Sequence, residues 1–458
     1  MKVNFIMNKK IANSPIFALL AFAAGIFCIQ LDAFALNLAL PQIGIDLSAS
    51  EGGLKWVVSV YLLSVGGLML AAGRLSDQYG YRNILIIGLA LFGIASILCA
   101  LAQSMSVLVI ARAIQGAGGA CIMPAGLALI TNVYPKEKRS KAIGLAIGIG
   151  GSATAGGPIL GGLVTEAVSW RLIFWLNIPI VLMAIYSAIF VKTEINDTYK
   201  TKLIDMRGLF LITLSLAILS LLIDGVSTGG NVNLNILLSM AFVILITMFF
   251  SSEKRSSNPL ISLEIFKNRN FIVLTVVGAV INAITVVFLF IVPLSLQDVW
   301  HLSPYSAGVA FLPPALIMAF GGPIAGRLKT LHAVFVMNVC LGVVAAVFIS
   351  VPKLSSFVMY LIGITICAIF LGIANALTLV ATQSVVSPVV AGTASGITKT
   401  IITLAAGLGV VLTGKAADQA IGLSADHTIH SISTSIGWFC FCVFVFLYLY
   451  VYGRVYKY

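Results

Sequence analysis

The sequence predicts an all-α integral membrane protein built from fourteen spanning helices. Of its 458 residues, 60% are hydrophobic and 9% are charged, whereas about 25% of residues are charged in an ordinary soluble domain. A soluble fold of this length could not cover so much apolar surface, because much of any folded surface stays in contact with solvent. Lipid is therefore the solvent for most of this chain.

Fourteen stretches of the chain meet the requirement of about 20 mostly apolar residues for a spanning helix. The connections between them are short and leave no room for a soluble domain. The stretches lie near residues 16–38, 54–73, 84–103, 107–133, 141–165, 171–191, 207–225, 234–251, 271–294, 304–327, 333–351, 355–381, 391–415 and 434–452.

The basic residues predict which helix ends face the cytoplasm. With the N-terminus inside, four of the 27 Lys and Arg residues fall outside and two, Arg112 and Lys399, fall within spans, so the other 21 lie in cytoplasmic segments. Lys and Arg concentrate in cytoplasmic loops, and we therefore expect both termini in the cytoplasm. The four outer residues are Lys55, Arg171, Lys353 and Lys415.

The longest basic loops divide the chain into two six-helix halves with two helices between them. The short sequence Gly-Arg-Leu ends both the second span, at 73–75, and the tenth, at 326–328. Such an echo favours duplicated halves, which are one known transporter plan. We expect an N-terminal bundle over 1–191, a cytoplasmic linker over 192–206, two inserted spans over 207–251, a second linker over 252–270 and a C-terminal bundle over 271–458.

Composition argues against several other classes of protein. The net charge is +12, but the basic residues form short clusters between apolar runs rather than a patch interleaved with aromatics, so we expect no nucleic-acid partner. The seven cysteines lie in apolar runs and the four histidines are scattered, which argues against disulfides and a metal site. We find no nucleophile–base pair or phosphate loop for an enzyme, and no filter-like loop for a channel.

Asp32 is the only carboxylate well inside a span, since Asp224 lies near the outer end of the seventh. Burial favours the neutral acid, whereas a nearby cation or water favours the carboxylate. An acid balanced between these influences can bind a proton in one conformation and release it in another. The alternative is a structural carboxylate paired with a neighbouring helix; for a lone intramembrane acid the functional interpretation is the default.

The fourth span carries an arginine on a face with small and polar residues. Arg112, Gln115, Gly116 and Gly119 follow the spacing i, i+3, i+4, i+7, which places them on one side of a helix. Burying the arginine costs at least ~2.5 kcal/mol, so it should face protein or water. It either takes part in transport or holds helices together through backbone carbonyls.

Two glycine-containing motifs lie at helix ends and interfaces. In the loop 73–82, which ends at Arg82, Gly73 and Gly80 permit a tight turn and close helix approach, and Asp77 can cap a neighbouring helix or pair with a basic residue. A plain turn with a solvated charge pair is the alternative. In the fifth span, the segment 157–162 combines small residues that favour close packing with a proline that bends the helix; its glycines and proline are Gly157, Pro158, Gly161 and Gly162.

Further polar residues fall within the spans. Lys399 lies about 12 Å from the cytoplasmic end of the thirteenth span at 1.5 Å per residue, so it could either extend to the membrane surface or line a cavity. Asn282 and Asn375 could line the same cavity or join helices by hydrogen bonds. The complete set of candidate substrate-cavity residues is Asp32, Asn37, Gln115, Asn282, Asn375, Lys399 and Asp224.

Together these motifs resemble the major facilitator superfamily, and within it the fourteen-helix drug:proton antiporter family. Residues 73–82 resemble its signature loop, 108–120 its helix-four motif, 157–162 its exporter motif and 31–41 its span-one motif. Gln78 and Tyr81 replace usually basic residues of the loop, and Ala153 replaces a usual glycine. Lys399 stands where the family commonly has an uncharged polar residue, which weakens the expectation of a cationic substrate.

The resemblance implies a major facilitator fold of two six-helix bundles plus two extra helices central in the chain. It also implies a proton-coupled multidrug efflux antiporter that exports small amphipathic, often cationic compounds, with Asp32 and Arg112 coupling proton movement and residues 73–82 acting as a conformational latch. We expect a monomer in a bacterial inner membrane that needs no cofactor beyond the proton gradient. The alternative is a proton-coupled importer or a metabolite exporter of the same fold.

Overall fold

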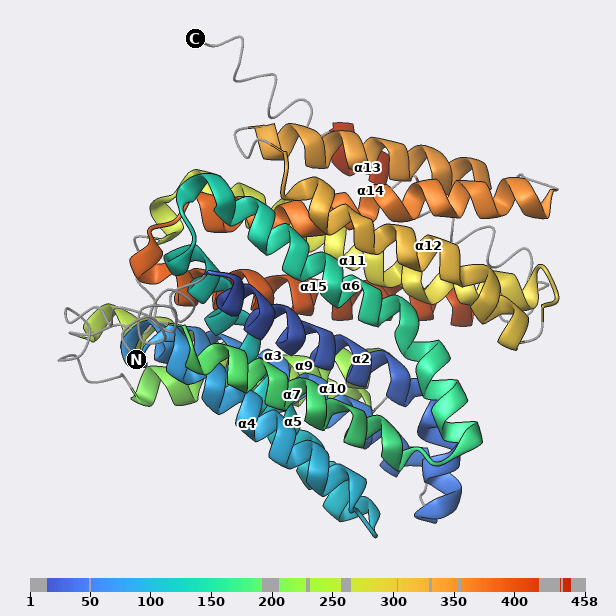
Figure 1. The fold of residues 1–458 in the computed structure, drawn as a ribbon, viewed down its shortest axis with the longest axis horizontal. Coiled ribbons are helices and arrows are strands. Elements are labelled where there is room, and N and C mark those ends of the chain that lie inside the picture. Colours follow the sequence, from blue (N-terminus) through green and yellow to red (C-terminus); the bar gives the residue numbers. More distant parts are fainter. Residues whose placement is uncertain are drawn as a thin grey trace, which may run out of the picture.

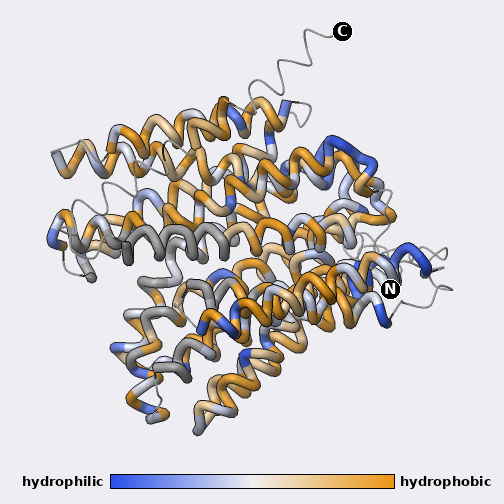
Figure 2. Tube along the Cα trace, turned by 180° about the vertical axis from the view of Figure 1, so that it is seen from behind, coloured by the Kyte–Doolittle hydropathy of each residue, from blue (hydrophilic) through white to orange (hydrophobic). Residues whose placement is uncertain are grey.

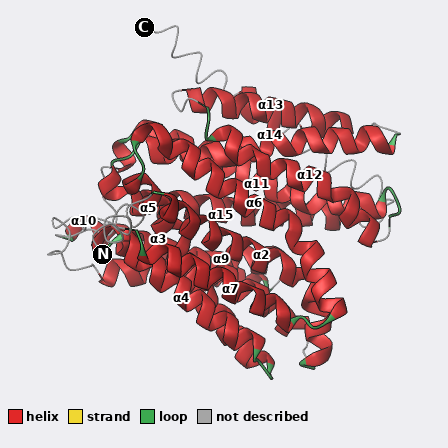
Figure 3. Cartoon of the chain, viewed as in Figure 1, coloured by secondary structure: helices red, strands yellow, loops and turns green. Residues whose placement is uncertain are grey.

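The predicted all-α fold is confirmed. The computed structural model describes residues 15–48, 51–191, 206–227, 231–256, 265–302, 304–328, 332–351, 356–419, 437 and 440–445. All regular structure in these ranges is helical (Figure 3). Hydrophobic residues make up most of each helix, and hydrophilic segments gather mainly at helix ends (Figure 2), as expected for a chain whose solvent is lipid.

The long helices coincide with the first thirteen predicted spans. Eleven helices of the structure are long and apolar enough to cross a membrane. The fourteenth predicted span, 434–452, lies largely outside the described residues, so a total of fourteen stays a prediction. The long helices are α2 (Ile16–Asp46), α3 (Glu51–Tyr79), α4 (Tyr81–Ala100), α5 (Met105–Val133), α6 (Lys136–Ala167), α7 (Arg171–Ile189), α9 (Met206–Ser227), α10 (Val232–Arg255), α11 (Arg269–Asp298), α12 (Pro304–Ala325), α13 (Ala333–Ser350), α14 (Phe357–Ser384) and α15 (Ala391–Gln419).

The helices form two groups that follow the order of the chain (Figure 1). In the first, α2 packs on α6 and α7, and α5 packs on α3 and α4. In the second, α14 packs on α11, α12 and α13. Each group has its own apolar core. In the second group the core consists of buried residues that lie between Leu274 and Cys440 in the chain.

The most extensive contacts between the groups are those of α6 with α12 and of α3 with α15. Small residues allow these helices to approach at backbone distance. A Cβ on Gly73 would come within 2.5 Å of the carbonyl oxygen of Gly392, and one on Gly148 within 2.7 Å of the Pro323 ring. These contacts lie at the end of the molecule that the positive-inside rule assigns to the cytoplasm.

The two inserted helices lie at the edge of this arrangement. α9 packs on α3 and α15, whereas α10 packs mainly on α9. Among the described residues of α10, only Phe249 and Glu253 are buried. The apolar outer face of α10 suits contact with lipid rather than with the rest of the chain.

Candidate functional site

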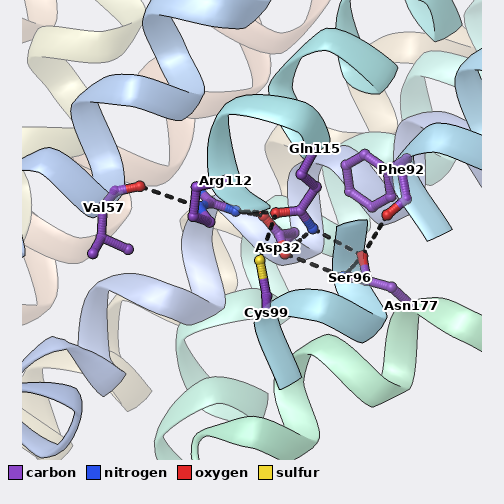
Figure 4. Close-up of polar contacts among 8 residues, drawn as sticks. All are labelled: Asp32, Val57, Phe92, Ser96, Cys99, Arg112, Gln115 and Asn177. Atoms are coloured by element: carbon purple, nitrogen blue, oxygen red, sulfur yellow. Dashed lines mark hydrogen bonds and ion pairs between the residues drawn. The ribbon is translucent and has the colours of Figure 1, made fainter. Parts of the chain in front are cut away.

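The carboxylate of Asp32 lies inside the N-terminal group of helices, halfway along α2, and is 0% exposed. It forms a salt bridge with the guanidinium of Arg112 on α5 (Figure 4). The side-chain amides of Gln115 and Asn177 donate to its other oxygen at 2.9 and 3.1 Å. In this conformation Asp32 therefore does not face an open cavity; protein groups occupy both of its oxygens.

Arg112 is 1% exposed and is held by groups from three helices. Its Nε donates to the carbonyl oxygen of Val57 on α3 at 3.1 Å, and its Nη1 donates to Gln115 Oε1 at 2.6 Å as well as to Asp32. The ring of Tyr61 lies 4.1 Å from the guanidinium carbon, a cation–π contact that strengthens away from water. The predicted alternative, an arginine that binds backbone carbonyls, is thus present together with the ion pair.

The face of α5 predicted from residue spacing is the one that meets its neighbours. Gly116 packs against the backbone of Tyr61, and Gly119 lies against Val65 and Ile29. A Cβ on Gly116 would come within 2.6 Å of the carbonyl oxygen of Tyr61 and push α3 away from α5, whereas one on Gly119 would make ordinary contacts. Gly116 therefore sets the distance at which Arg112 reaches the carbonyl group on α3.

Sequence reasoning missed two members of the network. Asn177 on α7 and Ser96 on α4 are buried, and Ser96 accepts hydrogen bonds from Gln115 at 2.9 Å and from Asn177 at 3.4 Å. The signal for Asn177 was available, because it is an amide well inside a predicted span, as Asn282 and Asn375 are. Together these residues connect α2, α3, α4, α5 and α7 around one buried charge pair.

The glycines of the fifth-span motif pack against α2 just beyond Asp32. A Cβ on Gly157 would lie 2.8 Å from the Cβ of Phe34, and one on Gly161 would overlap the backbone of Ala35. Pro158 falls within α6, which continues to Ala167. The motif thus sets the spacing of α6 and α2 next to the buried acid.

Asp77 joins the two groups of helices at the end predicted to be cytoplasmic. Its carboxylate accepts hydrogen bonds from the backbone N–H groups of Gly392 at 2.9 Å and Thr393 at 2.8 Å, and from the Thr393 hydroxyl. These amides lie at the N-terminus of α15, where a carboxylate stabilises unpaired donors and the helix dipole. The predicted cap between neighbouring helices is therefore present.

Other residues of the loop 73–82 shape its turn or form hydrogen bonds with other parts of the chain. Gly80 has a φ of 92°, a conformation that side-chain-bearing residues rarely adopt. Tyr81 donates to the carbonyl of Pro388 at 2.9 Å, a second contact between the groups. Arg82 instead donates to the carbonyl of Val191 at 3.1 Å, which is a contact within the N-terminal half of the chain.

The remaining cavity candidates are not gathered around Asp32. Asn282 on α11 donates to Asn375 on α14 at 3.1 Å, as in the alternative of helix-to-helix hydrogen bonding. Lys399 is half-buried on α15. The side chains of Asn37 and Asp224 lie outside the described residues.

A helical fold with its long apolar helices in two groups, an ion pair buried in one and a polar cap between them, is that of a membrane transporter. The chain belongs to the Major Facilitator Superfamily, whose family model matches residues 22–410.

Relatives of the chain include transporters named for different compounds. The chain is 31% identical to riboflavin transporter RibZ of Clostridioides difficile over 69% of this chain and 68% of that protein. It is 30% identical to multidrug resistance protein Stp of Mycobacterium tuberculosis, with 84% and 72% covered. It is 31% identical to the methylenomycin A resistance protein of Bacillus subtilis, with 72% and 70% covered.

The fold also matches a solved structure. The crystal structure of the human organic anion transporter MFSD10 (TETRAN) aligns with a TM-score of 0.64 over 94% of this chain and 99% of that one, at 14% identity. At that identity the match concerns the fold alone, and it confirms the major facilitator architecture expected from the motifs.

Proposed function

We propose that the protein is a proton-coupled antiporter that exports small amphipathic compounds from a bacterial cell by alternating access. The observation that carries the proposal is the buried ion pair of Asp32 and Arg112. A buried ion pair often stabilises a protein no more than well-packed apolar residues of similar size do. Its presence in a membrane interior therefore favours a functional role over a structural one.

The ion pair offers a direct way to couple a proton to movement. A proton on Asp32 removes the negative charge, so Arg112 loses its main partner and keeps the carbonyl of Val57 and the ring of Tyr61 on α3. Protonation thus changes how firmly α2 is bound to α3 and α5. Each proton that crosses the membrane potential supplies about 2.3 kcal/mol per 100 mV, and release of the proton on the cytoplasmic side would restore the pair.

The cap made by Asp77 supports a cycle between two conformations. In this structure the groups are joined at the predicted cytoplasmic end by Asp77 and Tyr81. Opening that end to a compound from the cytosol requires these hydrogen bonds to break. We infer that this conformation is closed to the cytoplasm, that the bundles over 1–191 and 271–458 rock about their common interface, and that the protein acts as a monomer with both termini in the cytoplasm.

The names of the relatives favour export and leave a second candidate for the transported compound. Two of them are named for resistance to drugs, which suits export of drug-like compounds across the bacterial inner membrane. Another is named as a riboflavin transporter, so a metabolite is the second candidate for the cargo.

A vesicle assay tests the proposal. The purified protein is reconstituted with a pH-sensitive dye inside, a pH gradient is imposed, and a panel including ethidium, a fluoroquinolone and riboflavin is added. We expect transport of at least one compound to drive protons across the vesicle membrane in the opposite direction. Asp32→Asn should abolish this proton movement, although the variant still folds and inserts into the vesicles. Asp46→Asn, at the far end of α2, is the control and should retain coupling.

The direction of proton movement, the effect of Asp32→Asn and the identity of the transported compound distinguish the alternatives. Proton movement in the same direction as the compound would replace the antiporter with a symporter. Proton release by Asp32→Asn equal to that of the unaltered protein would remove Asp32 from the coupling site. Release driven by riboflavin alone would favour the metabolite transporter.

A further inference from the structure

The position of Lys399 on α15 is fixed by its neighbours one turn away. Gly396 lies against the backbone of α3, with a would-be Cβ 2.9 Å from the carbonyl oxygen of Met69. Ser395 accepts a hydrogen bond from Gln383 on α14 at 2.8 Å. At 3.6 residues per turn, Lys399 lies one turn further along, on the strip of α15 between those two contacts. That strip faces the boundary between the two halves of the protein.

The opposite side of α15 is covered by α9. Ala394 and Ile397 share an apolar cluster with Ile212 and Leu216 of α9. On the same side as Lys399 and about one turn beyond it, Ile402 packs into the core of the N-terminal helices. These contacts place Lys399 on the side of α15 that faces the helices of both halves, which favours a cavity role over extension to the membrane surface.

The positive charge of Lys399 has no acidic partner in the described part of the chain. Asp32 is paired with Arg112 and Asp46 with Arg171, so each of those carboxylates already has a cation. The half-buried Lys399 thus carries an uncompensated charge. Removing such a charge from water is unfavourable unless an opposite charge approaches it.

The contact between α3 and α15 loosens at the same level as Lys399. Along the antiparallel pair of α3 and α15, Gly73 meets Gly392 and Met69 meets Gly396, so one further turn places Gly66 opposite Lys399. Gly66 is buried, yet no atom lies within 4 Å of the position that its Cβ would take. The two helices separate at this level, next to the unpaired ammonium group.

We propose that Lys399 binds an anionic group, such as a carboxylate, on the amphipathic compound that the protein exports. The proposal rests on the function proposed above and specifies its cargo: an anionic or zwitterionic compound rather than a simple cation. The apolar body would lie between the halves, and the acidic group would lie in the space beside Gly66. Such a cargo also makes the exchange electrogenic, because a monoanion leaving and a proton entering both carry charge in the same sense.

Direct binding tests the proposal without a proton gradient. The probes are rhodamine B, which carries a carboxylate, and its methyl ester, which has the same aromatic body without that charge; binding to the purified protein is followed by fluorescence polarisation. We expect the acid to bind more tightly than the ester. Lys399→Gln should weaken binding of the acid about tenfold, as expected for the loss of a charge-assisted hydrogen bond, and leave the ester unchanged, whereas Lys399→Arg should retain the preference. Lys267→Gln, at an exposed lysine outside the spans, is the matched control.

Each outcome bears on one proposal. The proposal about Lys399 is overturned if the acid does not bind, if the ester binds equally well, or if Lys399→Gln weakens both probes alike. A charge preference that depends on Lys399, combined with no proton release in the vesicle assay, would support this site and contradict the antiporter. Proton-coupled transport without the preference would contradict this site alone.

Discussion

The guanidinium group of Arg112 lies against the carboxylate of Asp32 with neither side chain reaching the surface. The carboxylate comes from α2 and the guanidinium from α5, 80 residues apart in the chain. Removal of one partner leaves the other as an unpaired buried charge, which typically costs about 3–5 kcal/mol. Several consequences can be measured.

Arg112→Gln should destabilise the protein and abolish transport, because Asp32 loses its cation. Arg112→Lys should not restore transport, since one ammonium group cannot bind Asp32, Gln115 and the carbonyl of Val57 in the forked geometry of a guanidinium. Thermal unfolding in detergent measures the loss. The double variant Asp32→Asn with Arg112→Gln should unfold at a higher temperature than Arg112→Gln alone, because the unpaired charge is gone. An unchanged unfolding temperature in Arg112→Gln would show that the pair is energetically silent.

Asp77→Asn should weaken the contact between the two halves, because a neutral amide binds the N-terminus of α15 less strongly than a carboxylate does. We expect slower turnover with little change in binding of the exported compound. Spin labels at Lys138→Cys and Arg327→Cys, both exposed at the predicted cytoplasmic end, report the separation of α6 from the end of α12. They require replacement of Cys442, the exposed cysteine among the described ones.

The label distances distinguish a latch from a general defect. Asp77→Asn should enrich the population with the longer distance between labels. Asp46→Asn, at the other end of the helices, should leave the distance distribution unaltered. Equal distributions in Asp77→Asn and the unaltered protein would contradict the role of Asp77 in closing this end.

Gly161→Ala should destabilise the contact of α6 with α2, because the added methyl group would overlap the backbone of Ala35. Overpacking of this kind typically costs about 1–3 kcal/mol. Gly156→Ala is the matched control on the same helix, since nothing lies within 4 Å of its would-be Cβ. Unfolding temperatures in detergent should fall for the first variant and not for the second. A similar fall in both would mean that the helix tolerates no alanine here, whatever its contacts.

Much of the fold could be predicted because each spanning helix satisfies its own backbone hydrogen bonds in lipid. Length and hydropathy alone therefore locate α2 to α15, and most bounds differ from the predicted spans by a few residues. α2 is an exception: it was expected to end near residue 38 and continues to Asp46, where Trp170 donates to its carboxylate and lowers the pKa of that group. Hydropathy along the chain cannot reveal a contact between residues as far apart as Asp46 and Trp170.

The candidate site was predictable residue by residue but not as an arrangement. Asp32, Arg112 and Asp77 stand out in the sequence because charge is costly within a span. Which partners neutralise them depends on how helices pack, so the pairing of Asp32 with Arg112 and of Asp77 with α15 required the structure. Asn177 and Ser96 entered the network for the same reason.

The sequence by itself determined that the chain crosses a membrane many times, which charges lie inside the spans and which residues resemble the transporter motifs. These properties follow from composition and local spacing, which act through the transfer of each segment into lipid. Only the tertiary structure decided that Asp32 is enclosed rather than open to a cavity, and that Lys399 faces the boundary between the halves. Both depend on contacts between helices distant in the chain, where packing and not hydropathy fixes the direction of a side chain.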